Sequence, residues 1–523
     1  MRSHLSAHDL TFTWPDGAPV VDGLDLDLGP GRHGLVGLNG SGKSTLLRLL
    51  AGELPPARGT VLVEGTLAYL PQDPLRGDEN DVADVLGIGP TLRALRRIEA
   101  GETDVALFDA VGDDWDVEER ATAELGRLGL ARLSLDRPIG TLSGGELVLL
   151  SLGARLLRRP GVLLLDEPTN NLDRSARARL RDVVDGWSGT LVVAGHDREL
   201  LASVDDIGEL RNGELRWFGG GFDAYEEIVA AEQETARRAV RDAEADVRKQ
   251  RRELADTQVK LARRARYGQK MNDQKREPKI IMGARKRAAQ VSAGRLRGEH
   301  EEDVAAAQER LEAAELEVRD DREIRLRLPA TAVPPSRVVL TTEELRLAHT
   351  GRAVDLDLRG PERVALIGAN GTGKTTLLRT VVGDVAPAGG SVHLRVPARY
   401  VPQRLDLLDD DLSVIDNVRR HAPDADQQHV RHQLARLLFR GRAAEREAST
   451  LSGGERVRAT LACVLLAEPA PQLLLLDEPT NNLDLASTRH LVEALASFEG
   501  CLVVVSHDER FLDELELDRR VEL

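Results

Sequence analysis

Apolar residues follow a common pattern in the two end regions of the chain. Short continuous apolar runs, such as "VLLLD" at 162–166 and "LLLLD" at 473–477, alternate with longer stretches in which apolar residues recur at helical spacing. Such a run predicts a strand buried on both faces, which is typical of a parallel sheet covered by helices. The alternation of these strands with helices predicts an α/β fold with a largely parallel sheet in each end region.

The middle of the chain has a helical pattern of another kind. Small or apolar residues recur there at alternating spacings of four and three, with Glu, Asp and Arg between them. This pattern predicts two antiparallel helices packed along a narrow, Ala-rich seam, each roughly 29 residues and about 43 Å long. Pro278 and Gly283 are expected to break the helices at the tip, and the Pro-rich segment at 328–336 to form a hinge or spacer. The seam positions are Ala236, Val240, Ala243, Val247, Gln250, Leu254, Thr257, Leu261, Val304, Ala307, Leu311, Ala314 and Val318.

Four segments of the first half return in the same order in the second half. The offset is 331 residues from Lys43 to Lys374, and 309, 311 and 311 residues for the later segments. Nearly constant offsets indicate a duplicated domain, with about 20 more residues within 73–142 of the first half. The sequence thus predicts two related domains, at 1–224 and 335–523, joined by a helical-hairpin linker at 225–334. The paired segments are 34–52 and 365–383, 141–146 and 450–455, 163–173 and 474–484, and 195–197 and 506–508.

The composition is typical of a soluble globular protein with several domains, since 41% of the 523 residues are hydrophobic and 30% are charged. The apolar runs are far shorter than the roughly 20 residues of a membrane-spanning helix. The N-terminal sequence "MRSHLSAHDLTFTW" lacks the apolar core of a signal peptide. We therefore expect a cytoplasmic protein without a membrane segment. Cys463 and Cys501 have apolar neighbours and are expected to be buried thiols, a disulfide being the alternative.

Positive charge is concentrated at the tip of the predicted hairpin. The formal net charge of the chain is -16, yet residues 263–297 carry twelve Lys or Arg against two acids, a local charge of +10. A solvated helix face is the alternative, but such a face mixes both signs, whereas the tip segregates one sign and includes Tyr267. Like charges repel one another unless a polyanion offsets them, so the tip, at 263–298, is predicted to bind nucleic acid. The candidate RNA-binding residues are Arg263, Arg264, Arg266, Lys270, Lys275, Arg276, Lys279, Arg285, Lys286 and Arg287.

Two glycine-rich segments, "GLNGSGKS" at 37–44 and "GANGTGKT" at 368–375, each follow a predicted strand and precede a predicted helix. Glycines let backbone N–H groups approach phosphates at a helix N-terminus. Lys43 and Lys374 are predicted to reach the β- and γ-phosphates of ATP, and Ser44 and Thr375 to bind Mg²⁺. The candidate nucleotide-binding residues are Gly37, Leu38, Asn39, Gly40, Ser41, Gly42, Lys43, Ser44 and Thr45, with Gly368, Ala369, Asn370, Gly371, Thr372, Gly373, Lys374, Thr375 and Thr376.

Paired carboxylates follow the two strands at 162–166 and 473–477. Asp166 and Asp477 are predicted to hold Mg²⁺ through its water shell. Glu167 and Glu478 are predicted to orient or deprotonate the attacking water, with His196 and His507 contacting the γ-phosphate. A histidine alone would be assigned to the surface, but each of these follows an apolar strand 29 residues after its glutamate.

These motifs resemble the ABC ATPase superfamily, whose signature is "LSGGE". The resemblance implies that each ATP lies between the phosphate loop of one domain and the signature of the other. One site then pairs Lys43 and Glu167 with the second signature, and the other pairs Lys374 and Glu478 with the first. His349 stands where the first half has the adenine-stacking Trp14, and Leu149 where the second has Arg458, so the resemblance implies two unequal sites. The further residues that it implies are Trp14 for adenine, Gln72 and Gln403 for Mg²⁺, and Ser143, Gly144, Gly145, Ser452, Gly453 and Gly454 of the signatures.

The whole chain resembles the ABC-F family, which has two ABC domains, no membrane segment and a helical linker with a basic tip. That resemblance implies a monomer whose two ABC domains pair with each other, and whose linker tip reaches rRNA and the P-site tRNA of the ribosome. The tip is similar to those of actinobacterial members that confer antibiotic resistance by ribosome protection. Asn171 and Asn482 replace a histidine that is usual in the family, which fits the same branch. The extra residues within 73–142 resemble a reduced form of the family's arm, which touches the ribosomal L1 stalk.

Three other functions remain open on the sequence. A translation factor without a drug role shares every motif and differs only in the tip. The ATP-binding subunit of a drug exporter, of the macrolide type, requires a membrane partner and leaves the basic hairpin unexplained. A DNA-repair ATPase of the coiled-coil type has a far longer coil and a Cys-x-x-Cys hook, which this sequence lacks.

Overall fold

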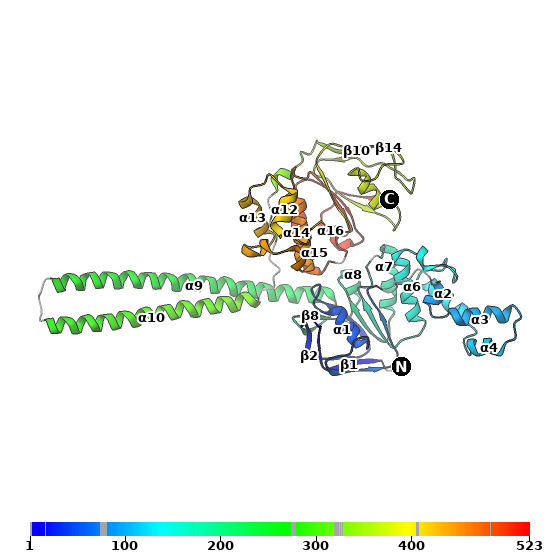
Figure 1. Cartoon of the computed structure of the whole chain (residues 1–523), viewed down its shortest axis with the longest axis horizontal. Coiled ribbons are helices and arrows are strands. Elements are labelled where there is room, and N and C mark those ends of the chain that lie inside the picture. Colours follow the sequence, from blue (N-terminus) through cyan, green and yellow to red (C-terminus); the bar gives the residue numbers. More distant parts are fainter. Residues whose placement is uncertain are drawn as a thin grey trace. The chain divides into compact units, whose positions relative to one another are not determined.

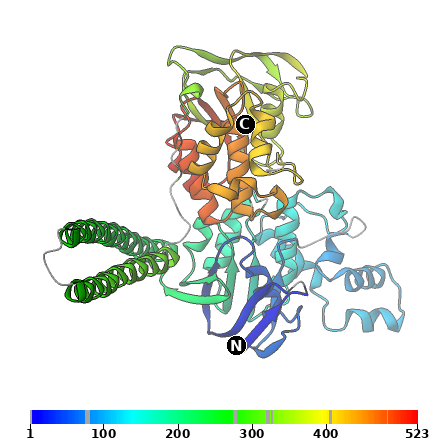
Figure 2. The ribbon, with the colours of Figure 1, turned by 60° about the vertical axis from the view of Figure 1, so that its left-hand side comes forward.

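The computed structural model (Figures 1 and 2) describes residues 3–15, 17–73, 81–170, 172–273, 279–317, 324, 326, 328–403, 407–481 and 483–523. In the two longest helices it describes the backbone alone at 265, 268, 269, 271–273, 279–290, 293, 297, 316 and 317. The chain forms two compact units, one of Met1–Tyr225 with Glu323–Leu523 and one of Glu226–Arg322. The first unit contains both copies of the repeated domain.

The first domain is built on a mostly parallel six-stranded sheet in the order β5-β6-β7-β3-β8-β9. Only the last pair, β8 and β9, is antiparallel. Every residue of β6 and β7 is buried, as expected for strands that are covered on both faces. A second, antiparallel sheet has the order β2-β1-β4. The strands are β1 (His4–Thr13), β2 (Pro19–Leu28), β3 (Gly31–Val36), β4 (Arg58–Glu64), β5 (Leu67–Leu70), β6 (Val162–Asp166), β7 (Thr190–Ala194), β8 (Asp206–Arg211) and β9 (Glu214–Gly219).

Helices pack on this sheet and extend beyond it. Helix α6 is buried along most of its length and shares a core with α2, α5, α7, β6 and β7. Helices α3 and α4 lie side by side in both views and have a small core of their own, which includes Leu95 and Leu107. They fall within 73–142, and among the described residues the second domain has two α-helices where the first has α2 to α5. The helices are α1 (Lys43–Leu50), α2 (Val82–Val85), α3 (Gly89–Glu99), α4 (Val105–Val111), α5 (Val117–Arg127), α6 (Gly144–Leu156), α7 (Arg174–Asp185) and α8 (Arg198–Leu201).

The second domain repeats the topology of the first, which confirms the predicted duplication and the α/β fold. Its parallel sheet has the order β15-β16-β17-β13-β18, the counterpart of β5-β6-β7-β3-β8. Strand β10 pairs with β11, β12 and β14 in a second sheet. The elements are β10 (Val338–Arg346), β11 (Ala353–Val354), β12 (Leu358–Arg359), β13 (Arg363–Ile367), α11 (Lys374–Val381), β14 (Gly389–Leu394), β15 (Ala398–Val401), α12 (Val414–His421), α13 (Gln427–Arg436), α14 (Gly453–Leu465), β16 (Leu473–Asp477), α15 (Leu485–Ala496), β17 (Cys501–Val505), α16 (Glu509–Glu514) and β18 (Arg519–Glu522).

The two cysteines are free thiols in the core of the second domain. Cys463 lies in α14 and Cys501 begins β17, and both are buried. Burial raises the pKa of each thiol to about 12, so neither forms the reactive thiolate at neutral pH. The expectation of buried thiols is confirmed.

The second unit is an antiparallel hairpin of two long helices, α9 (Phe222–Asp273), whose first residues belong to the first unit, and α10 (Lys279–Glu317); the two lie side by side in both views. Each predicted seam position that the structure describes is buried or half-buried, while most of the residues between them are exposed. Val247 and Ala307 are the most buried, at 6% and 1% exposed, and Arg310 forms an ion pair with Asp246 at 3.0 Å. The predicted hairpin and its seam are therefore confirmed.

Three local predictions for this region are wrong. Helices of 52 and 39 residues replace the expected 29, and Gly283 lies inside α10, whereas Pro278 lies outside the described residues. A single glycine costs only about 1 kcal/mol in a helix, and good helix formers surround it. The segment at 328–336 is no spacer, because Leu328 and Val333 are buried in the cores of the second domain and the Thr331 hydroxyl accepts a hydrogen bond from the Glu499 backbone at 3.2 Å.

Candidate functional site

Both phosphate loops lie where a central strand of the parallel sheet leads into a helix. The first loop joins β3 to α1 and the second joins β13 to α11. Gly42 and Gly373 precede the helices with φ of 102° and 103°, a left-handed conformation that glycine adopts without steric cost. The predicted nucleotide-binding residues at 37–45 and 368–376 all lie in these connections or in the first helical turns. The loops thus have the strand–loop–helix form that binds phosphate.

The two loop lysines are buried and turned back onto their own loops. Lys43 Nζ donates hydrogen bonds to two loop carbonyl oxygens at 2.8 and 3.3 Å, and Lys374 Nζ does the same at 2.7 and 2.9 Å. Their exposed fractions are 6% and 7%. Burial lowers the pKa of each ammonium, while nearby carboxylates such as Glu167 and Glu478 oppose that shift. Anionic phosphate oxygens would compensate these buried cations.

The aspartates that end β6 and β16 lie beside the loops. Asp166 is 2% exposed and accepts a hydrogen bond from the Ser44 hydroxyl at 3.0 Å. Burial raises the pKa of Asp166, against the hydrogen bonds from Ser44 and Tyr69 that lower it. Asp477, at 3% exposed, has the same place at the end of β16. A hydroxyl next to a carboxylate is a donor set that suits Mg²⁺, which takes few protein ligands beside phosphates and water.

Two tyrosines hold these aspartates, and sequence reasoning missed them. The Tyr69 hydroxyl, on β5, donates to Asp166 Oδ2 at 3.2 Å, and the Tyr400 hydroxyl, on β15, donates to Asp477 Oδ2 at 3.0 Å. Burial, followed by the adjacent aspartate, raises the pKa of both phenols. The sequence could have revealed them, because in each half a tyrosine stands three residues before the predicted glutamine.

Replacement of Tyr69 by Phe is expected to lower the melting temperature by about 2 °C, since a buried carboxylate loses a donor worth about 1 kcal/mol. Thermal unfolding by circular dichroism measures the change. Tyr267→Phe is the matched control, because Tyr267 is 68% exposed. Equal melting temperatures for the two variants would show that the Tyr69 hydroxyl does not support Asp166.

The predicted catalytic glutamates and histidines form one pair in each domain. His196 Nε2 lies 3.2 Å from Glu167 Oε1, and His507 Nε2 lies 3.3 Å from Glu478 Oε1. Both glutamates have φ of 47°, which is rare for a residue with a side chain and often marks a functional site. Burial raises the pKa of both carboxyl groups to about 7 and lowers the pKa of both histidines. Each pair therefore favours a neutral imidazole next to a carboxyl group that exchanges its proton near neutral pH.

The signature segments begin helices α6 and α14. Ser143 and Ser452 are the N-caps, and each forms a reciprocal capping box with the glutamate three residues on. The glycines at 144, 145, 453 and 454 lie in the first turns, where N–H groups point out of the helix. The second signature reaches the first phosphate loop, because a Cβ at Gly453 would lie 3.6 Å from Asn39 Cβ. This contact supports the predicted pairing of the two domains.

Two further aspartates cross between the domains, and sequence reasoning did not include them. Asp484 Oδ2 accepts a hydrogen bond from the Asn39 backbone N–H, in the first phosphate loop, at 2.8 Å. In the mirrored contact Asp173 accepts from the Asn370 backbone. Burial opposes ionisation of Asp173, but its hydrogen bonds, that one included, lower its pKa. Each aspartate also caps the following helix, α7 or α15. The repeat of "NNLD" in both halves could have drawn attention to these aspartates. The neighbouring sequence, however, does not indicate that Asp484 contacts Asn39, which lies 445 residues away.

Other predicted residues lie at the margins of the sites. The Trp14 ring is half-buried and packs edge-on against Phe12 at 5.1 Å. His349 has φ of 66° and lies in a turn. Gln72 and Gln403 follow β5 and β15 and are exposed, and among the described residues neither forms a hydrogen bond with Asp166 or Asp477. Arg458 lies over the Phe439 ring at 5.7 Å, whereas Leu149 packs in the first core. Asn171 and Asn482 lie outside the described residues.

The structure describes part of the predicted basic tip. Arg263, Arg264, Arg266 and Lys270 lie on α9 with exposed side chains, beside Tyr267 at 68% exposed. Lys279, Arg285, Lys286 and Arg287 belong to α10, where only the backbone is described, and Lys275 and Arg276 lie outside the described residues. The described cations therefore project into solvent, available to a polyanion.

Comparison with known proteins gives the family. The ABC transporter family model matches residues 21–170 and 352–481. The chain is 34% identical to the tylosin resistance ATP-binding protein TlrC of Streptomyces fradiae, over 97% of this chain and 95% of that protein. It is 31% identical to the energy-dependent translational throttle protein EttA of Mycobacterium tuberculosis, over 94% and 87%, and 32% identical to the probable ATP-binding protein YheS of Escherichia coli K12, over 96% and 77%.

Among solved structures, the archaeal ribosome recycling factor aABCE1 in complex with stalk protein aP1 matches 98% of this chain and 87% of its own, with a TM-score of 0.55 and 20% identity. That likeness shows the shared fold of two ABC domains. No helix within the described ranges is long and apolar enough to cross a membrane. Two ATP-binding ABC domains, a helical hairpin between them and relatives aligned over nearly the whole chain place this protein in the ABC-F family.

Proposed function

We propose that this protein hydrolyses ATP, acts on the ribosome and confers antibiotic resistance by ribosome protection. The observation that carries the proposal is the 34% identity to the tylosin resistance protein TlrC over 97% of this chain. The basic hairpin tip supports it, since it offers a site for RNA in a chain of net charge -16. A ribosomal role also agrees with the similarity to the translational throttle protein EttA. The proposed place of action is the cytoplasm.

The geometry of the two sites supports the chemistry that we propose for them. Glu167 and Glu478 accept a proton from the attacking water, and the neutral His196 and His507 beside them contact the γ-phosphate. The loop lysines bind the β- and γ-phosphates, and N–H groups of the signature helices on the opposite domain complete each site.

A magnesium ion fits the donor set at the end of β6. The Ser44 hydroxyl and the Asp166 carboxylate already lie 3.0 Å apart there, and Thr375 and Asp477 are their counterparts in the second domain. When bound, Mg²⁺ neutralises charge on the β- and γ-phosphate oxygens. Gln72 and Gln403 are proposed to complete its surroundings from the exposed ends of β5 and β15.

The proposed partner is the ribosome, contacted through rRNA and the P-site tRNA by the hairpin tip at 263–298. Exposed arginines at 263, 264 and 266 suit phosphate contacts, and Tyr267 suits stacking on an unpaired base. The protein is proposed to act as a monomer, because its two ABC domains supply both halves of each ATP site. We also propose that the first ABC domain spans residues 1–224, the linker 225–334 and the second ABC domain 335–523.

Expression of the gene in a susceptible bacterium tests the drug role. Inhibitory concentrations of tylosin and of other ribosome-targeting antibiotics are measured with the wild type and with Lys43→Ala/Lys374→Ala, which loses the cations of both phosphate loops. We expect at least about a fourfold rise for one antibiotic class with the wild type only. No rise for any drug, with ATP-dependent ribosome binding intact, would favour a translation factor without a drug role.

A further inference from the structure

One position at the interface between the ABC domains carries a positive charge in the first domain alone. Asp197 and Asp508 occupy mirror positions after the histidines of the two domains, at the repeat offset of 311 residues. Arg177, on α7, has Thr488 as its counterpart on α15 at the same offset. Only the first domain therefore contributes a cation at this position, although the two aspartates are equivalent.

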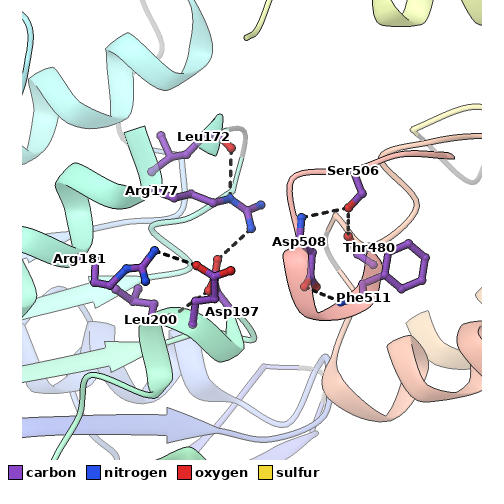
Figure 3. Close-up of polar contacts among 10 residues, drawn as sticks. Leu172, Arg177, Arg181, Asp197, Leu200, Thr480, Ser506, Asp508 and Phe511 are labelled. Atoms are coloured by element: carbon purple, nitrogen blue, oxygen red, sulfur yellow. Dashed lines mark hydrogen bonds and ion pairs between the residues drawn. The ribbon is translucent and has the colours of Figure 1, made fainter. Parts of the chain in front are cut away.

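Arg177 is held in place from its own domain. Its Nη1 lies 2.9 Å from Asp197 Oδ2, and its Nε donates to the Leu172 carbonyl oxygen at 3.2 Å. The side chain is 16% exposed. Figure 3 shows the guanidinium pointing from α7 toward the loop of the second domain that carries Ser506 and Asp508. A fixed and largely buried guanidinium thus faces the loop that also carries His507.

The charge of Arg177 acts on the second domain. Burial and Asp197 raise the pKa of Asp508, and Arg177 and Arg198 oppose that shift. Burial, Lys374 and Arg177 all lower the pKa of His507. The groups that act on His196 of the first site are Lys43 and Asp484, with no arginine among them. Arg177 therefore contributes its charge to the second site from the opposite domain.

Two neighbouring ion pairs have the same polarity, whereas a third, between Arg510 of the second domain and Asp223 of the first at 3.0 Å, has the opposite polarity. Arg198 pairs with Glu514, and Arg174 with Glu509 at 3.3 Å, so first-domain arginines meet second-domain acids in both. Arg198 is only 9% exposed, and a buried cation needs such a partner. Arg177 pairs with Asp197, and its charge offsets the repulsion that Asp197 exerts on Asp508 across the interface.

We propose that Arg177 is a positioning residue that acts across the interface, drawing the second domain's Ser506–Asp508 loop against the first domain so that the second ATP site closes more firmly than the first. The inference rests on the proposed ATP hydrolysis. It makes the two sites unequal through one side chain, in addition to any effect of Trp14 and His349 on adenine binding.

Single-site enzymes test the inference. Glu167→Gln leaves the second site able to hydrolyse ATP, and Glu478→Gln leaves the first. Arg177→Ala in the Glu167→Gln background is expected to lower kcat about fivefold with little change in KM, since closure contributes after ATP has bound. In the Glu478→Gln background the fall is expected to stay below about twofold, and Arg177→Lys is expected to restore most of the lost rate.

Arg181→Ala is the matched control, because Arg181 lies one turn further along α7 and pairs with Glu199 of its own domain at 2.8 Å. Thr488→Arg should raise the rate of the first site by supplying the missing cation. Equal losses at both sites, or an equal loss with Arg181→Ala, would overturn the inference.

Nucleotide retention keeps the test independent of hydrolysis. In the Glu167→Gln/Glu478→Gln protein, Arg177→Ala is expected to shorten the residence of one of two bound fluorescent ATP molecules about fivefold. If neither single-site enzyme hydrolyses ATP but Arg177→Ala still shortens nucleotide residence, the proposed ATPase activity is rejected and the proposed role of Arg177 stands. Unchanged retention would overturn that role.

Discussion

Replacement of Glu167 and Glu478 by Gln is expected to abolish turnover and to make the protein co-sediment with ribosomes only when ATP is present. Loss of a general base lowers the rate about 10²- to 10⁴-fold, whereas the lysines and N–H groups that bind ATP remain. The domains then stay closed around two ATP molecules, and the ribosome-bound form accumulates. Co-sedimentation with ribosomes, with and without ATP, measures the binding, and phosphate release measures the turnover.

The same substitution is not expected to harm the fold. Burial raises the pKa of both glutamates to about 7, from 4.5. Above pH 4.5 the unfolded chain ionises these groups more readily than the folded protein does, so they destabilise the fold at pH 8. A neutral amide removes that cost, and the melting temperature at pH 8 should stay equal or rise.

Glu64→Gln/Glu343→Gln is the matched control, since both of these side chains are exposed on strands of the antiparallel sheets. This variant also replaces two glutamates by glutamines, and it should hydrolyse ATP as the wild type does. Undiminished turnover in the Glu167→Gln/Glu478→Gln protein would refute the assignment of the bases. Absence of pelleting with ATP bound would refute the ribosome as partner and direct attention to a membrane-bound one.

Replacement of Arg263, Arg264 and Arg266 by Ala is expected to weaken ATP-dependent ribosome binding at least about tenfold and to flatten its salt dependence. Each phosphate contact contributes about 0.7 to 0.9 to the slope of log K against log salt, so loss of three contacts lowers the slope by about 2. The chain is acidic outside the tip, so little other surface compensates for the loss. Binding measured at three salt concentrations gives the slope.

Arg248, Arg251 and Arg252 serve as the control for the tip. They lie on the same helix and are exposed, and their replacement by Ala removes an equal charge from the mixed-sign stem. We expect a slope change of less than about 1. If tip and stem variants have the same slope, the basic tip is a solvated helix face and carries no contact with RNA.

The local sequence pattern was sufficient to predict much of the structure of this protein. Within about 20 residues of sequence, an apolar run, a glycine-rich turn and a helical pattern already determine the strand–loop–helix that places Lys43 and Ser44. The run before Asp166-Glu167 likewise predicts a strand buried on both faces, and β6 is one. The hairpin seam was also readable, because its spacing of four and three places Val247 and Ala307 on the same helix faces that the structure buries.

Other features follow only from the tertiary structure. Tyr69 meets Asp166 because β5 and β6 are neighbours in the sheet, although 97 residues separate them. The segment at 328–336 has the composition of a spacer, yet Leu328, Thr331 and Val333 in it are buried against the second domain. In the sequence, Arg177 is indistinguishable from the many surface arginines. Only the packing of the two domains shows that its guanidinium points toward the loop that carries Asp508. Sequence periodicity reports which face of an element is apolar, whereas strand order and domain packing decide which distant residues meet, and no short window of sequence contains that information.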